Sequence, residues 1–292
     1  MDSGIITVLL PLALAFIMIG LGLELSPKDF ARVSKHPKAV LIALFCQLVL
    51  LVGIAFILCK VLALPPLLAV GLMLLAASPG GSTANLFSYL FKGDLALNIT
   101  LTAINSVIAA ITLPLIVNVS IQHFMQEGQQ ISLQFSKILQ VFGIIIIPVC
   151  IGMLLRHYAP KFTEKLHKPL RIFAVVFLIL IIIGAIYSER NNIATYLTQV
   201  GLATILFCIF SLCIGYFVPR LLGINSAQAC AFEIGIHNST LAMTIALTVM
   251  ASSAVAMPAA VYSLFMYIFA AVFGFLITRF APLPAQLAEK AS

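Results

Sequence analysis

Charged side chains are scarce in this sequence. Asp, Glu, Lys and Arg make up only 9% of the 292 residues, whereas 62% of the residues are hydrophobic. The mean hydropathy is accordingly high, at +1.17. A soluble domain needs far more charge to keep its surface hydrated, so this composition excludes one. It indicates an integral membrane protein whose environment is the lipid bilayer.

Several signatures of enzymatic or metal sites are also missing. The six cysteines form no CxxC pair and lie within or at the ends of apolar runs, so we expect them to be small core residues. Neither GxSxG nor HExxH occurs. An intramembrane hydrolase that uses Glu233, His237 and Ser239 as a triad is an alternative, but no catalytic motif in the sequence supports it. The ring of repeated filter residues that oligomeric channels use is absent as well.

Long apolar runs account for most of the chain. The first run has no basic residue before it and no small-residue cleavage site after it, so we predict a membrane span there and not a signal peptide. About 20 apolar residues cross a bilayer. By this rule the sequence predicts an all-α polytopic membrane protein with nine transmembrane helices, at residues 4–25, 39–61, 66–91, 95–118, 135–155, 172–188, 196–219, 226–250 and 256–279.

The basic residues gather in alternate loops between these predicted spans. Of the 16 Lys and Arg residues, 13 fall on one side and only Lys60, Lys137 and Arg190 on the other. The positive-inside rule then places the N-terminus outside and the C-terminus in the cytoplasm, in a plasma or inner membrane. The net charge of +7 reflects this topology, so we expect no nucleic-acid partner. Nothing in the sequence indicates an obligate protein partner.

Two of the predicted spans are interrupted near their middle by polar and helix-breaking residues. The third span contains SPGGSTAN at 78–85, and the eighth contains EIGIHNST at 233–240. Unwound backbone is tolerated at membrane depth only where it is buried in protein or lines a cavity. The two spans are five apart in order, so they cross the membrane in opposite directions, as an inverted repeat requires. We expect breaks at residues 80–82 and 235–238 that cross each other and mark a transporter's binding site.

One carboxylate lies deep in a predicted span. Glu233 is the only acidic residue so placed, and His237, four residues later, is the only histidine. Unpartnered, such groups cost several kcal/mol each in hydrocarbon, and an intramembrane carboxylate is a functional-site hypothesis by default. Neighbouring spans carry amide and hydroxyl oxygens, which together with a carboxylate suit a hard cation such as sodium.

The runs SPGGSTANLFSYLFKGDLALNITLT, EIGIHNSTLA and GLGLELSPKDFARVSKHPKAV together resemble the bile acid:sodium symporter family. The resemblance extends from about residue 12 to residue 279. It implies a single transporter unit with two broken crossing helices, organised as two domains. A core domain would comprise residues 39–118 and 196–279, and a panel domain residues 4–25 and 135–188.

The resemblance also implies ligands. A first sodium site would use the side chains of Asn85, Thr102, Glu233 and Asn98. Ala84 stands where family members often carry Ser, so it would offer only its carbonyl. A second would use Gln47, Glu233, the carbonyls of Ile234 and Ile236, and position 237, which is usually Gln in the family and is His237 here. The substrate cavity would be lined by Ser82, Thr83, Asn238 and Ser239.

From these observations we expect a sodium-coupled symporter that imports an organic anion, such as a bile acid or a small carboxylate, by alternating access. The cofactor would be Na⁺, as one or two ions. The alternative is a proton-coupled carrier or antiporter on the same fold, in which Glu233 and His237 exchange a proton.

Overall fold

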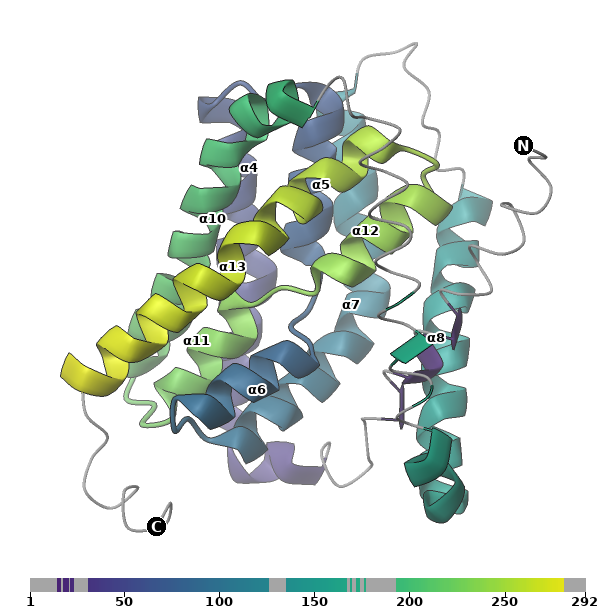
Figure 1. The fold of residues 1–292 in the computed structure, drawn as a ribbon, viewed down its shortest axis with the longest axis vertical. Helices are drawn as coiled ribbons and strands as arrows, with labels where there is room; N and C mark the ends of the chain where they lie inside the picture. The colour runs from purple at the N-terminus through teal and green to yellow at the C-terminus, as the bar shows by residue number, and fades with distance from the viewer. Residues whose placement is uncertain are drawn as a thin grey trace.

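The computed structural model describes residues 31–125, 135–166 and 193–280, together with residues 15–16, 18–20, 22–23, 169, 172–173 and 176. Of these, residues 82, 135–146 and 193 are described by their backbone alone. The regular elements of these residues are helices (Figure 1). This confirms the all-α prediction for the part of the chain that is described.

The first half of the chain forms one long composite helix, then two short helices, then two further long helices. A 3₁₀ turn, η1 (Arg32–Lys35), precedes α3 (Pro37–Phe45), the π-helical turn η2 (Cys46–Leu50) and α4 (Leu51–Val61), which run on as one apolar rod. Two short helices follow, α5 (Pro66–Ala77) and α6 (Ser82–Leu90). They lead into α7 (Leu95–Phe124) and α8 (Phe135–Tyr158).

The second half repeats the sequence of one long helix, two short helices and one long helix. These are α10 (Ile193–Leu221), α11 (Ala227–Gly235), α12 (Ser239–Thr248) and α13 (Ser253–Phe280). Among the residues that the structure describes, four helical stretches are long and apolar enough to cross a membrane: Pro37–Val61, Leu95–Phe124, Ala194–Leu221 and Ser253–Phe280. Seven of the predicted spans thus coincide with helical segments within a few residues. The other two, 4–25 and 172–188, lie almost entirely outside the described residues, so the count of nine stays a prediction.

The two predicted breaks are present. α5 ends at Ala77 and α6 begins at Ser82, whereas α11 ends at Gly235 and α12 begins at Ser239. The first break, at 78–81, begins two residues earlier than predicted and ends one residue earlier, because Ser82 is already helical. The second, at 236–238, is one residue shorter than predicted, because Gly235 is still helical. Residue 78 and residue 81 have extended backbone, which ends one helix and starts the next.

The broken helices form the centre of the bundle. In Figure 1, α6 and α11 lie in one half of the molecule and α5 and α12 in the other, with the two breaks between them. α11 packs against α10, α6 and α7, and α12 packs against α13 and α5. All nine residues of α11 are buried. α8 stands at the side of the bundle and packs against α7 (Figure 1).

The outer helices present apolar side chains outward. Leu41 on α3, Leu202 on α10 and Leu264 on α13 are all exposed large hydrophobic residues. Lipid tails are as apolar as these side chains, so such a surface suits the bilayer. Polar side chains of the spans such as Gln47, Asn98 and Glu233 are instead buried in the bundle.

Candidate functional site

The two breaks pair with each other. Gly80 and His237 form an isolated antiparallel bridge, and the backbone N–H of Asn238 donates to the carbonyl of Pro79 at 2.8 Å. The C-terminal ends of α5 and α11 and the N-terminal ends of α6 and α12 therefore meet at one place. Helix C-termini present unsatisfied carbonyls and helix N-termini present unsatisfied N–H groups. The crossing thus offers partial negative charge beside partial positive charge, which can attract ions of either sign.

The close approach of the two breaks depends on glycine. A Cβ atom added to Gly80 would lie 2.5 Å from the carboxyl carbon of Glu233 and 2.6 Å from its carbonyl oxygen. The carboxyl carbon belongs to a side chain that could move, but the carbonyl oxygen is backbone, so relief of that contact would require the end of α11 to shift. Gly80 therefore lets one break lie directly against the carboxylate that precedes the other.

Glu233 is buried, with 1% of its surface exposed, in the last turn of α11. Its Oε2 accepts a hydrogen bond from the Thr102 hydroxyl of α7. That hydroxyl also lies 3.5 Å from Oδ1 of Asn85, which is half-buried on α6. The structure thus brings together three of the predicted residues from three different helices.

One face of α7 lines this site with further oxygens. Asn98, Thr102 and Asn105 recur at helical spacing and are all buried. Asn98 Nδ2 donates to the carbonyl of Ala229 at 2.8 Å, which directs the side chain toward α11. Ala84, which was expected to offer its carbonyl, is fully buried in the first turn of α6.

Several buried oxygens at the crossing have no hydrogen-bond partner among the described residues. They include Gln47 Oε1, Asn98 Oδ1, Asn105 Oδ1 and Glu233 Oε1. Leaving a buried polar atom unpaired costs about 1–3 kcal/mol. Carboxylate and amide oxygens accept hydrogen bonds and do not donate them. A hard cation is the kind of ligand that such oxygens bind. The donor set therefore fits sodium.

His237 is engaged on both sides of its ring. Nδ1 lies 3.1 Å from the Tyr262 hydroxyl, and Nε2 lies 3.3 Å from Nε2 of Gln47. The Tyr262 hydroxyl donates its single hydrogen to the carbonyl of Gly235, at 2.7 Å. Nδ1 must then carry the imidazole hydrogen, and Nε2 accepts from Gln47. Both ring nitrogens thus have partners in this structure, and a role for His237 as a cation ligand stays a prediction.

Gln47 lies on η2 and is buried. Its amide nitrogen reaches the carbonyls of Ala76 and Ser78 at 3.2 and 3.1 Å, at the end of α5. Ile234 and Ile236, whose carbonyls were expected to join Gln47, are both buried beside the end of α11.

The four predicted substrate residues lie at two helix starts. Ser82 and Thr83 open α6, whereas Asn238 precedes Ser239 at the start of α12. Asn238 caps its helix, accepting from the N–H of Leu241 at 3.0 Å. Thr83 and Asn238 are half-buried, unlike the fully enclosed carboxylate, and only the backbone of Ser82 is described.

Sequence reasoning missed two features of this site. Tyr262 of α13 is fully buried and bonded to the second break, yet it lies in a span that we predicted only as apolar. Its hydroxyl was the available signal, because a buried tyrosine hydroxyl usually has a partner. The π turn η2, which positions Gln47, has no signal in the sequence.

The chain was then compared with known proteins. The family model described as the Sodium Bile acid symporter family matches residues 11–196. The uncharacterized sodium-dependent transporter YocS of Bacillus subtilis is 28% identical over 252 residues, which cover 86% of this chain and 77% of that protein.

Relatives also occur in plants and animals. The ileal sodium/bile acid cotransporter of Homo sapiens is 26% identical over 278 residues, covering 93% of this chain and 79% of that protein. The probable chloroplastic sodium/metabolite cotransporter BASS1 of Arabidopsis thaliana is 28% identical over 271 residues, covering 92% of this chain and 66% of that protein. The family match spans well over half of the chain and includes the first break and its glycines. The chain therefore belongs to the sodium bile acid symporter family.

Proposed function

We propose that this protein is a sodium-coupled symporter of a small organic anion. The observation that carries the proposal is Glu233, a buried carboxylate at the crossing of two broken helices, whose Oε1 has no partner among the described residues. A charge in this position is stable only when a cation or a proton accompanies it. Family membership favours the cation.

The family consists of transporters, and this protein is not an enzyme. The side-chain geometry agrees with this. A hydrolase would need His237 to activate Ser239, but the two ring nitrogens of His237 face Gln47 and Tyr262.

For the first sodium ion we propose the side-chain oxygens of Glu233, Thr102 and Asn85, with Asn98 and the carbonyl of Ala84 completing the set. Support comes from Thr102, whose hydroxyl donates to Glu233 Oε2 and lies 3.5 Å from Oδ1 of Asn85, so the three side-chain oxygens are close together. The ion would neutralise the carboxylate and hold α6, α7 and α11 together at the crossing.

For a second sodium ion the proposed ligands are Gln47 Oε1, Glu233 and the carbonyls of Ile234 and Ile236. Gln47 Oε1 is buried and without a partner in the described part of the chain. His237 is not among these ligands, because Gln47 and Tyr262 already occupy its two nitrogens.

Proton coupling is the second candidate, and the hydrogen bonds argue against its simplest form. Direct exchange of a proton between Glu233 and His237 requires a hydrogen bond between them. Among the described residues, Glu233 is bonded to Thr102 and His237 to Gln47 and Tyr262. We therefore favour sodium as the coupling ion.

The substrate would bind where α6 and α12 begin, near Ser82, Thr83, Asn238 and Ser239. Helix N-termini attract anions through their free N–H groups and dipoles. Relatives are named for transport of bile acids and of metabolites. We accordingly propose a bile acid or a small carboxylate as the substrate.

Transport would proceed by alternating access in a protein of nine transmembrane helices. A core of residues 39–118 and 196–279 would move against a panel of residues 4–25 and 135–188. The N-terminus would lie outside and the C-terminus in the cytoplasm of a plasma or inner membrane. Sodium bound beside the breaks would raise the affinity for the anion, and by linkage the anion would raise the affinity for sodium equally.

Uptake into proteoliposomes tests this proposal. Radiolabelled bile acids and small carboxylates would be offered with an inward sodium gradient, with potassium in its place, or with a pH gradient alone. We expect accumulation of at least one anion only with sodium, at a fixed pH. Accumulation driven by the pH gradient without sodium would instead support the proton-coupled carrier.

A further inference from the structure

We propose that His237 and Tyr262 act as a positioning pair that fixes the amide of Gln47, so that its oxygen and not its nitrogen is left for the cation. The inference rests on the proposed function, because it concerns the second ion of that site. Neither residue would touch the ion. Both would act through Gln47.

A chain of three hydrogen bonds defines the pair, and its direction follows from the donors. The Tyr262 hydroxyl has one hydrogen and gives it to the carbonyl of Gly235, at 2.7 Å. At 3.1 Å from that hydroxyl, His237 Nδ1 must supply the hydrogen of the next bond. The other ring nitrogen is left with a lone pair, which faces the Gln47 amide nitrogen at 3.3 Å.

This lone pair completes a surface of acceptors around one end of the Gln47 amide. The amide nitrogen lies 3.2 Å from the carbonyl of Ala76 and 3.1 Å from the carbonyl of Ser78, in addition to the histidine. The amide nitrogen has two hydrogens to donate among these three acceptors, and a rotated amide would turn its oxygen toward them and lose those bonds, each worth about 1 kcal/mol. The orientation is therefore fixed, with Oε1 buried on the opposite side and without a partner in the described structure.

The surroundings hold the pair in place. Phe207 of α10 packs against both rings, with ring centroids 5.1 Å from His237 and 6.0 Å from Tyr262. Phe207, His237 and Tyr262 are each at most 2% exposed. Gln47 itself extends from the π turn η2, a local widening of the helix that often occurs at functional sites.

Removing the Tyr262 hydroxyl should release this arrangement. In Tyr262→Phe, Nδ1 loses its acceptor, so the imidazole can move its hydrogen to the nitrogen that faces Gln47. Two N–H groups would then oppose each other, and the amide would be held in its orientation only by the carbonyls of Ala76 and Ser78. We expect the sodium concentration for half-maximal uptake to rise about three- to tenfold, as loss of roughly one hydrogen bond implies.

The test measures sodium dependence of uptake in proteoliposomes at saturating substrate. Tyr216→Phe is the matched control, since Tyr216 is also buried but its hydroxyl has no hydrogen-bond partner among the described residues. His237→Gln should stay close to the unsubstituted protein, because glutamine can accept from Gln47 and donate to Tyr262. His237→Leu can do neither, and should match Tyr262→Phe.

Three outcomes would overturn the inference: Tyr262→Phe matching Tyr216→Phe, His237→Leu retaining the original sodium dependence, or His237→Gln being as impaired as His237→Leu. The last would mean that the imidazole acts in some way other than positioning. If Tyr262→Phe does not fold, the two His237 variants carry the test. Uptake without any sodium dependence in the unsubstituted protein would contradict the proposed function itself, a distinguishable result.

Discussion

At the scale of single residues, the site combines one negative charge with an excess of acceptors. Glu233 receives a hydrogen bond from Thr102, but its second oxygen and those of Asn98 and Asn105 have no partner among the described residues. The amide donor of Gln47 is used outside this set, because its nitrogen faces the carbonyls at the end of α5. Such an imbalance is costly in a protein interior unless a cation completes it.

Gly80 gives a prediction at this scale. In Gly80→Ala the new methyl group would meet the carboxyl carbon and the carbonyl oxygen of Glu233, at 2.5 and 2.6 Å. The break must then shift away from the carboxylate, so we expect sodium-driven uptake to fall at least about tenfold, the effect of losing roughly 1.4 kcal/mol. Initial uptake rates in proteoliposomes measure it.

Gly53→Ala is the matched control for this change. Gly53 lies in α4, where an added Cβ atom meets nothing within 4 Å. Alanine favours a helix over glycine by up to about 1 kcal/mol, so this variant should be at least as stable and fully active. Equal activity in the two alanine variants would show that close approach of the breaks is unnecessary.

At the scale of the elements, the two breaks were predictable from local sequence, whereas the contacts between distant helices were expected only through the family resemblance or, for Tyr262, not at all. Two polar runs interrupt apolar sequence: Pro79 with the paired glycines that follow it, and the residues from Glu233 onward. At membrane depth, backbone that is not helical is tolerated only where it is buried in protein or lines a cavity. The contact of Gln47 with His237 joins residues 190 apart in the chain, and Tyr262 reaches Gly235 across 27 residues. Such pairings depend on how helices pack, which local sequence patterns do not encode.

The start of α7 offers a prediction about stability. Asp94 caps this helix, accepting from the N–H of Leu97 at 3.0 Å, and also accepts from the Ser226 hydroxyl before α11, at 3.3 Å. Asp94→Ala loses both bonds and should cost about 1–2 kcal/mol. Asp94→Asn keeps a capping oxygen and should lose much less.

Thermal unfolding followed with a thiol-reactive dye suits this comparison, because the chain has no tryptophan and several of its cysteines, such as Cys208 and Cys230, are buried. We expect a clearly lower midpoint for Asp94→Ala and a midpoint close to the original for Asp94→Asn. Equal midpoints for both variants and the unsubstituted protein would mean that the cap contributes nothing to stability.

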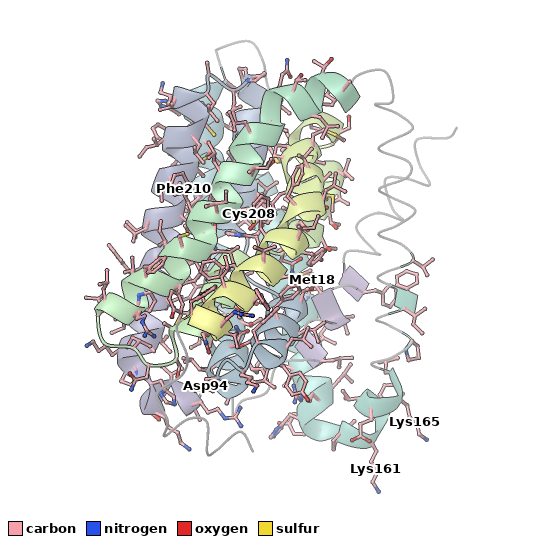
Figure 2. The ribbon with its side chains drawn as sticks, turned by 60° about the vertical axis from the view of Figure 1, so that its left-hand side comes forward. Met18, Asp94, Lys161, Lys165, Cys208 and Phe210 are labelled. Atoms are coloured by element: carbon pink, nitrogen blue, oxygen red, sulfur yellow. The ribbon has the colours of Figure 1, made fainter. Side chains whose placement is uncertain are left out.

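At the scale of the whole molecule, one end of the bundle carries the basic loops. Figure 2 places Asp94 at the same end as Lys161 and Lys165. The loop before α7 also holds the exposed Lys92. By the positive-inside rule we propose that this end is cytoplasmic.

Single cysteines in a cysteine-free variant test this orientation. We expect cysteines at Lys92 and Lys165 to react with a membrane-impermeant maleimide only from the cytoplasmic side. Lys60, exposed at the end of α4, should react only from outside. Labelling of all three from the same side would contradict the proposed topology.

The central claim is that a sodium ion held by Glu233 drives transport. The most direct test is to measure sodium-gradient uptake by Glu233→Gln and by the unsubstituted protein at the same pH. Glutamine keeps the volume and can still accept from Thr102, but it removes the charge that attracts the ion. We predict that uptake falls to the level of empty liposomes while the protein remains folded and monodisperse. Sodium-driven accumulation that survives this substitution would contradict the mechanism.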